Sequence, residues 1–149
     1  MLTSLKPLNH PPKTFISASA IGYYGDRGAD LLHENSAPGN TFLAHLCVAW
    51  EEAALEAQAL GIRVVTPRFG TVLGPDGGAL ARLIPLFKLG LGGPIGMGRQ
   101  WMSWITIDDL IELLIFIMEE ESISGSVNAV APYPITNREF SRTLAHALR

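Results

Sequence analysis

Three hydroxyl-bearing side chains are grouped near the start of the chain and could act on a substrate. Ser19, Tyr23 and Tyr24 lie in the stretch 13–26, KTFISASAIGYYGD. A serine hydroxyl can hydrogen-bond a substrate hydroxyl, and a tyrosine phenol can donate or accept a proton. A structural interpretation is also open, in which Ser19 satisfies the end of a strand and a buried tyrosine directs its hydroxyl to a backbone group.

The strand that must position these hydroxyls is short and apolar. Thr14, Phe15 and Ile16 are β-branched or aromatic without polar alternation, which is typical of a parallel strand covered on both faces. The residues from Ser17 to Ala20 are small and leave room for a ligand beside the backbone. In open α/β sheets ligands bind at the carboxyl ends of the strands. We therefore expect the site at the end of this strand.

A helix and a second strand follow. The helix is predicted over residues 41–60, with Asn40 as its N-cap and Gly61 as its stop. A strand over residues 62–69 comes next, so the order strand, helix, strand predicts a βαβ unit with a parallel sheet. The helix face predicted to be buried carries Leu43, Leu46, Cys47, Trp50, Ala54 and Ala57.

The second half of the chain continues the α/β pattern. A strand over residues 104–107 should lead into a helix capped by Asp108 and Asp109. Thr136 and Glu139 have the spacing of a capping box that opens a last helix. The other predicted elements are a helix over residues 79–89, a glycine-rich loop over 90–98 and a strand within 125–131.

Composition excludes several classes of protein. Of the 149 residues 48% are hydrophobic and 17% charged, which indicates a globular chain, and the net charge of −3 with scattered Lys and Arg argues against nucleic acid as a partner. The longest apolar run, residues 110–118, is shorter than the roughly 20 residues that cross a bilayer. We expect no signal peptide, no metal site among the four histidines, and a cytoplasmic location because Cys47 is alone.

Four ordered segments carry a resemblance to a known family. They are SASAIGYYGD, RFGTVLGPDGG, GLGGPIGMGRQWMSWITIDDL and GSVNAVAP. In this order they resemble the C-terminal part of an extended short-chain dehydrogenase/reductase of the NAD-dependent epimerase/dehydratase family, in an epimerase-like subgroup of uncertain activity. The resemblance covers residues 13–149. It implies an α/β fold, a partial Rossmann-like parallel sheet with a small substrate-side α/β portion.

The resemblance also implies a function and site residues. It implies NADP or NAD as cofactor, a small-molecule substrate, and hydride transfer at a hydroxyl-bearing carbon, with Ser19 orienting the hydroxyl and Tyr23 or Tyr24 handling the proton. The residues it assigns to the cofactor are Ser17, Arg68, Phe69, Gly70 and Thr71, and those it assigns to the substrate are Arg99, Gln100, Trp101 and Asn128.

Several of these assignments have a structural alternative. Arg68 could instead be a structural cation paired with Asp108 or Asp109. Trp101 could be a core residue rather than a stacking wall, and Asn128 could be a buried amide satisfied by backbone. A diphosphate clamp by Arg99 is doubtful because Met102 stands where the family often has a further arginine.

Two departures from the family pattern leave the activity open. The Tyr-x-x-x-Lys pair of these enzymes aligns with Leu43 and Cys47, which cannot replace it. The glycine-rich turn for the pyrophosphate is expected upstream of residue 1, so residues 1–149 are predicted to be one domain without its N-terminal nucleotide-binding portion. The alternatives are a catalytically silent nucleotide-binding or interaction module, or a truncated inactive fragment whose exposed sheet edge favours aggregation or a homodimer.

Overall fold

A parallel sheet centred on one buried strand organises the molecule. The computed structural model describes residues 11–148. The expectation of no signal peptide concerns residues 1–10, which lie outside the described residues. Strand β3 (Arg63–Phe69) pairs in parallel with β1 (Thr14–Ile16), β2 (Ser19–Ala20) and β7 (Gly125–Ala129). β1 and β2 share one register against β3 and are two parts of one edge strand, interrupted at residues 17–18. The predicted α/β fold with a partial parallel sheet is confirmed.

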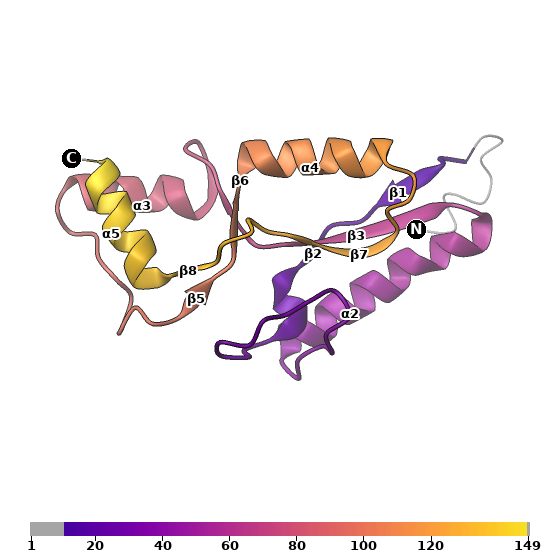
Figure 1. Cartoon of the computed structure of the whole chain (residues 1–149), viewed down its shortest axis with the longest axis horizontal. Helices are drawn as coiled ribbons and strands as arrows, with labels where there is room; N and C mark the ends of the chain where they lie inside the picture. The colour runs from indigo at the N-terminus through magenta and orange to yellow at the C-terminus, as the bar shows by residue number, and fades with distance from the viewer. Residues whose placement is uncertain (1–10, 149) are drawn as a thin grey trace.

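Helices cover the two faces of this sheet. Figure 1 shows α4 (Ile107–Glu119) on one side of the strands and α2 (Phe42–Leu55) on the other. On the α2 side, Val64 belongs to a buried cluster with residues of α2 and of the short helix η2 (Glu56–Leu60). On the α4 side, Leu110 packs with Ile105 and Ala129. Apolar burial on both faces explains the apolar residues Phe15 and Ile16 of β1 and Val64 and Val65 of β3.

The N-cap of α2 differs from the prediction by one residue. The N-cap is Thr41 and not Asn40: Thr41 has extended backbone angles, and its Oγ1 accepts a hydrogen bond from the Ala44 N–H at 3.2 Å. The predicted stop at Gly61 agrees with the structure, since this glycine has a φ of 75° in the left-handed region that favours glycine.

The buried face of α2 also differs from the prediction. Leu43 and Trp50 are 60% and 59% exposed, and Leu46 is exposed as well. The predicted burial of Cys47, Ala54 and Ala57 is confirmed, and Ala44 and Glu51 are the other buried residues of this face. The small side chains let the helix axis approach the sheet closely, and Glu51 is drawn inside by an arginine of β3 that is described below. The larger apolar residues therefore form an exposed stripe.

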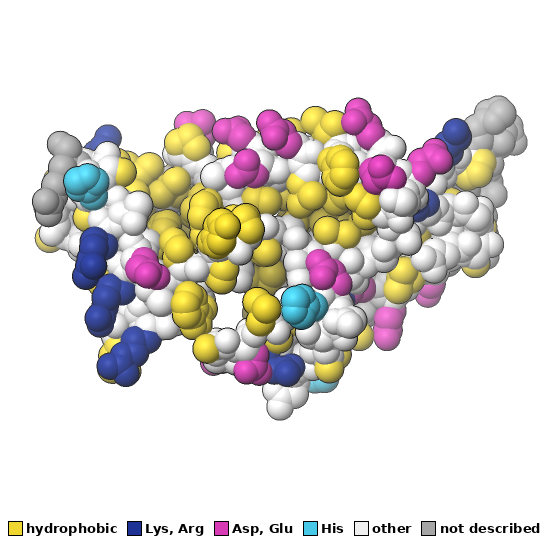
Figure 2. All heavy atoms as spheres, in the orientation of Figure 1, with side chains coloured by type: hydrophobic (Ala, Val, Ile, Leu, Met, Phe, Trp, Pro, Cys, Tyr) yellow, Lys and Arg dark blue, Asp and Glu magenta, His cyan; other side chains and the backbone are white. Residues whose placement is uncertain are grey.

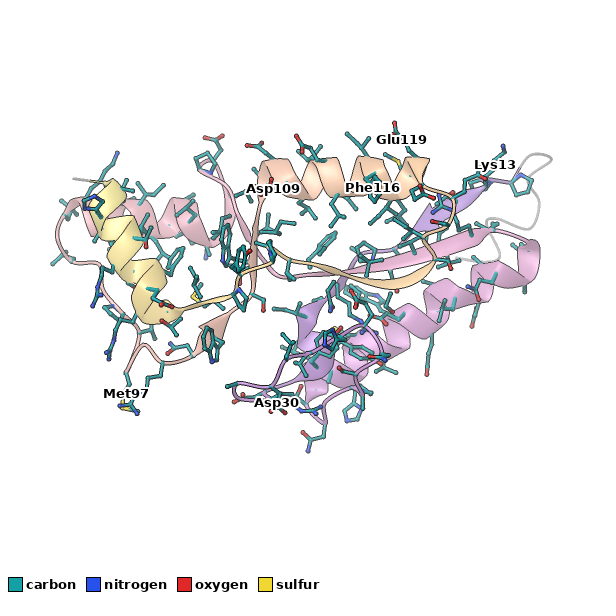
Figure 3. The ribbon with its side chains drawn as sticks, viewed as in Figure 1. Lys13, Asp30, Met97, Asp109, Phe116 and Glu119 are labelled. Carbon is teal, nitrogen blue, oxygen red and sulfur yellow. The ribbon has the colours of Figure 1, made fainter. Side chains whose placement is uncertain are left out.

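A threonine, not an aspartate, caps α4. Thr106 Oγ1 accepts from the Asp109 N–H at 3.1 Å and donates to Asp109 Oδ2 at 2.7 Å, so Asp108 and Asp109 lie in the first turn rather than at the cap. Figure 3 shows Asp109 and Glu119 at the two ends of this helix. At its C-terminal end the Arg63 guanidinium donates to four carbonyl oxygens, those of Ile117, Met118, Glu120 and Ile123.

A smaller portion of the chain lies at the other end of the molecule from Lys13 (Figures 1 and 3). It contains α3 (Gly78–Lys88), α5 (Asn137–Ala147) and β5 (Trp101–Met102), which pairs antiparallel with β8 (Ile135–Thr136). Between this portion and the main sheet, β4 (Thr71–Leu73) pairs in parallel with β6 (Trp104–Thr106), which leads into α4 (Figure 1). Within residues 11–148 no helix is long and apolar enough to cross a membrane. No group of three metal-ligating side chains comes together in the same described part.

The start of α5 offers a test of the fold. Thr136 and Glu139 form the predicted capping box, with side-chain to backbone hydrogen bonds in both directions. Because Thr136→Ala leaves the Glu139 N–H without its partner, we expect the free energy of unfolding in urea to fall by about 1 kcal/mol. Thr143→Ala, at an exposed position inside the same helix, should leave it unchanged or slightly raised. Equal losses in both variants would contradict the cap.

Candidate active site

The register of the sheet places three of the predicted site residues in one row. Ser19 lies opposite Arg68, and Arg68 lies opposite Asn128, on the adjacent strands β2, β3 and β7. All three residues are close to the carboxyl ends of their strands, and β2 continues directly into the 3₁₀ turn η1 (Ile21–Tyr24) that carries both tyrosines. The strand ends and the tyrosine turn therefore meet at one edge of the sheet.

A buried ion pair lies at the centre of this row. Arg68 and Glu51 are only 2% and 7% exposed, and they make two parallel hydrogen bonds, Nε to Oε1 and Nη2 to Oε2, both at 2.8 Å. The prediction that Arg68 pairs with Asp108 or Asp109 is wrong, because those carboxylates lie at the start of α4 while Arg68 points toward α2. The planar guanidinium matches the carboxylate geometry in a way that a lysine could not.

The pair is held in its charged form. Burial alone would raise the pKa of the Glu51 carboxyl, but hydrogen bonds from Arg68 and Ser19 together with the charge of Arg68 hold that pKa below its ordinary value. Burial would likewise lower the pKa of Arg68, and the hydrogen bonds to Glu51 and Tyr24 with the Glu51 charge raise it above its ordinary value. A carboxylate in this state is a poor proton acceptor, so Glu51 is not a candidate general base.

Ser19 donates its proton to this pair. Its hydroxyl is buried and donates to Glu51 Oε1 at 2.6 Å. On β7, Ser126 donates to Glu51 Oε2 at 3.2 Å and accepts from Arg68 Nη2 at 3.1 Å. The oxygen of Ser19 can still accept a hydrogen bond, but its proton is already used within the protein.

Tyr24 and Asn128 complete the polar cluster. The Tyr24 hydroxyl donates to Asn128 Oδ1 at 2.6 Å and accepts from Arg68 Nη1 at 2.9 Å. The same Nη1 donates to the Glu34 carbonyl at 3.0 Å, and the Asn128 N–H donates to the Glu34 carboxylate at 2.9 Å. Tyr24 is buried, as its structural alternative holds, but its hydroxyl contacts side chains and not a backbone group. Asn128 is half-buried, and only its Nδ2 reaches the backbone, at the Leu32 carbonyl 3.5 Å away. We call the group of Ser19, Tyr24, Glu51, Arg68, Ser126 and Asn128 the Arg68 cluster.

Tyr23 contacts the cluster with its ring and not with its hydroxyl. The guanidinium carbon of Arg68 lies 3.4 Å from the centroid of the Tyr23 ring, which is cation–π geometry. The rings of Tyr23 and Tyr24 meet edge to face, with centroids 5.3 Å apart. The Tyr23 ring is only partly buried, and its hydroxyl takes no part in the hydrogen bonds of the Arg68 cluster.

The positions of the missing Tyr-x-x-x-Lys pair face the same turn. A Cβ atom on Gly22 would lie 3.8 Å from Leu43 Cβ and 4.0 Å from Cys47 Sγ. The residues that align with the pair therefore lie beside η1, and neither supplies the phenol or the ammonium group of that pair. Cys47 is buried and Leu43 is exposed.

Four of the five residues assigned to the cofactor, Arg68, Phe69, Gly70 and Thr71, follow one another at the end of β3. A Cβ on Gly70 would lie 2.7 Å from the Ser103 carbonyl oxygen and 2.9 Å from Val130, so packing within the chain already requires a glycine there. Thr71 donates its N–H to the same Ser103 oxygen at 2.8 Å, and Phe69 packs against the cluster of Ile105. Ser17 is half-buried in the interruption between β1 and β2, where its N–H donates to the Val65 carbonyl.

The residues assigned to the substrate do not form one group. Arg99, Gln100 and Trp101 lie in β5 and the loop before it, and none of them takes part in the hydrogen bonds of the Arg68 cluster. Gln100 donates to the Ile95 carbonyl at 3.0 Å, and Trp101 is 52% exposed. Only Asn128 of this set belongs to the Arg68 cluster.

Two essential members of the cluster, Glu51 and Ser126, were missed at the sequence level. One signal for Glu51 was present, since it follows Cys47 by four residues and precedes Ala54 by three, which places a carboxylate on a helix face of small apolar residues. A carboxylate on such a face needs a buried cation. Ser126 carried no comparable signal.

Removal of the Glu51 charge should destabilise the fold strongly. Glu51→Gln leaves the Arg68 guanidinium buried without a counter-charge, and such losses typically reach about 3–5 kcal/mol. Glu52→Gln, at the exposed neighbouring position, should change the free energy of unfolding little. The double variant Glu51→Leu with Arg68→Met should be more stable than Glu51→Gln. An unchanged stability of Glu51→Gln in urea unfolding would contradict this account.

The ion pair also predicts a dependence of stability on acid. Because the folded-state pKa of Glu51 is below its ordinary value of 4.5, its contribution is present above that pH and is lost as the pH falls through the lowered value. The free energy of unfolding should therefore decrease as the pH falls below 4.5, and less steeply in the Glu51→Leu, Arg68→Met double variant. Urea unfolding at a series of pH values measures both slopes, and equal slopes would exclude the contribution of Glu51.

Known proteins similar to this chain are members of one family. The family model described as the NAD dependent epimerase/dehydratase family matches residues 2–130. An epimerase family protein of Mycobacterium leprae is 46% identical over 136 residues, which are 91% of this chain and 44% of that protein. The chloroplastic homologue of epimerase family protein SDR39U1 from Arabidopsis thaliana is 42% identical over 147 residues, 99% of this chain and 42% of that protein.

Solved structures give the same assignment. The human epimerase family protein SDR39U1, whose crystal structure contains NADPH, superposes with a TM-score of 0.90 at 36% identity over 98% of this chain and 50% of that chain. A nucleoside-diphosphate sugar epimerase of Corynebacterium glutamicum superposes with a TM-score of 0.84 at 44% identity, over 91% of this chain and 29% of that chain. The chain thus spans about half or less of the length of these relatives. It belongs to the NAD-dependent epimerase/dehydratase family.

Proposed function

We propose that this chain is the C-terminal part of an NAD(P)-dependent, epimerase-like oxidoreductase, with the nicotinamide end of the cofactor at the carboxyl ends of β2 and β3. The observation that carries this proposal is the row of Ser19, Arg68 and Asn128 beside the tyrosine turn η1. The binding of NADPH by the human relative supports it. The substrate would be a small molecule with a hydroxyl-bearing carbon.

Within this site we assign the proton transfer to the hydroxyl of Tyr23. The nicotinamide would supply or accept the hydride. In the reducing direction, the Tyr23 hydroxyl would donate its proton to the carbonyl oxygen of the substrate, and the Arg68 cation at 3.4 Å from its ring would stabilise the phenolate that is left. The Ser19 hydroxyl donates its hydrogen bond to Glu51, and its oxygen would accept a hydrogen bond from the substrate hydroxyl. Tyr24 would hold Arg68 and Asn128 in place.

The pyrophosphate needs a partner outside these residues. Gly90, Gly93 and Gly96 have the spacing G-x-x-G-x-x-G, but they lie between α3 and β5 and not between a first strand and its helix. We therefore assign the pyrophosphate to a nucleotide-binding half that would add strands to β1. Among the described residues no strand pairs with the outer edge of β1. Cytoplasmic location and pairing of two copies stay predictions.

A second candidate function is nucleotide binding without turnover. The observation that favours it is the pair of Leu43 and Cys47 beside η1, where the family has its proton-donating tyrosine and its lysine. Loss of a positioned general acid or base lowers a rate typically by about 10²- to 10⁴-fold. In this case the Arg68 cluster would have a structural role alone.

The test joins this chain to a nucleotide-binding half. The first half of the Mycobacterium leprae relative is fused in front of it, NADPH binding is measured by calorimetry, and oxidation of NADPH is followed by the nicotinamide absorbance with a panel of carbonyl compounds. We expect binding and turnover, and a loss of turnover of about 10²-fold or more in Tyr23→Phe with unchanged NADPH affinity. Tyr133→Phe, at an exposed tyrosine outside the Arg68 cluster, should retain both.

The outcomes separate the two candidates. NADPH binding without turnover of any compound in the panel would favour the silent module. Turnover that survives in Tyr23→Phe would remove the assignment of Tyr23. An absence of NADPH binding in a folded fusion protein would overturn both candidates.

A further inference from the structure

A cavity lies at the α5 end of the molecule, and none of the residues that line it belongs to the Arg68 cluster. Its volume is about 420 Å³, and it opens between the glycine-rich loop and α5. The loop contributes Gly92, Gly93 and Pro94, and the helix contributes Arg138, Ser141 and Arg142. None of these residues has a role in the function proposed above.

The cavity is lined by positive charge without an acidic side chain. Arg138 and Arg142 are four residues apart on α5, which places them one above the other on the same helix face. The carboxylate that lies between them in sequence, Glu139, does not line the cavity, and its Oε2 accepts from the Thr136 N–H at 2.8 Å. The hydrogen bonds from Thr136 and the nearby charge of Arg142 hold the pKa of Glu139 below its ordinary value. Figure 2 shows Lys and Arg side chains gathered at this end, although the chain as a whole carries a net charge of −3.

Hydrogen bonds fix the loop to the helix. The Ile95 N–H donates to Asn137 Oδ1 at 2.7 Å, and the Arg138 N–H donates to the Gly98 carbonyl at 3.0 Å. Arg138 also donates from Nη2 to the Met97 carbonyl at 2.8 Å, which holds its guanidinium at the loop. Figure 3 shows Met97 at the outer tip of this loop. The two walls of the cavity are therefore preformed.

We propose that this cavity binds a phosphate ester of a small molecule. Arg138 and Arg142 lie one helical turn apart in the wall of the cavity, and guanidinium groups suit the oxygens of a phosphate, which accept paired hydrogen bonds. Gly93 has open space where a side chain would start, so the backbone of the loop can approach a ligand. The cavity volume lies within the range of roughly 300–1,000 Å³ of small-molecule sites, which leaves room for an organic group beside the phosphate.

The test is a titration of the full chain followed by NMR at constant ionic strength, with inorganic phosphate and with glycerol 3-phosphate as probes. We expect saturable shifts of the backbone amides of Gly92 and Gly93 and of the Nε–H of Arg142. The ester should bind at least as tightly as inorganic phosphate. Arg142→Gln should raise the dissociation constants of both probes about tenfold, the loss of affinity expected for one charge-assisted hydrogen bond.

A matched variant controls for net charge. Arg27→Gln removes the same charge at an exposed arginine that pairs with Asp30, outside the cavity, and should leave the dissociation constants unchanged. Equal weakening in both variants, or shifts that do not saturate and spread over all arginines, would overturn the site. Binding of inorganic phosphate without binding of glycerol 3-phosphate would overturn the assignment to an ester. Both variants change exposed side chains, and their unfolding transitions without ligand confirm that they fold.

Discussion

The buried pair of Glu51 and Arg68 is the constraint on which the candidate site depends. Two charges withdrawn from water are tolerated only when they are paired and their remaining hydrogen-bonding groups are satisfied. Here the pair recruits Ser19 from β2, Ser126 from β7 and Tyr24 from η1, and no buried side-chain N or O atom within residues 11–148 lacks a partner. The hydrogen bonds that satisfy the Arg68–Glu51 pair therefore hold the strand ends, the tyrosine turn η1 and helix α2 together.

The same constraint limits the chemistry. Hydroxyl groups that satisfy the ion pair are not at the same time proton donors to a substrate, and this removes Ser19 and Tyr24 from that role. Tyr23 is placed differently, because it meets the cation with its ring and keeps its hydroxyl outside the hydrogen-bonded group. The arrangement thus offers one phenol beside one cation, where other members of the family would use a tyrosine beside a lysine.

Local patterns predicted the elements better than the contacts between them. The strands β1 and β3, the stop at Gly61 and the Thr136 capping box are predicted from neighbouring residues alone, and the structure agrees with them. The orientation of α2 depends on what the sheet presents to it. Residue size favoured a buried face through Leu43 and Trp50, but close packing on the sheet selected alanines. The partner of Arg68 could not be predicted from local patterns either, because the contact with Glu51 depends on how α2 packs on β3.

Strand β3 carries two arginines, and their spacing has a further consequence. Arg63 and Arg68 are separated by an odd number of positions, so their side chains leave the strand on opposite faces. Arg63 holds the carbonyl end of α4, and Arg68 holds the carboxylate of α2. Each helical layer is thus bound to the same strand by its own cation. Because β3 also pairs along both of its edges, with β1 and β2 on one side and β7 on the other, its backbone amides should exchange slowly with deuterium.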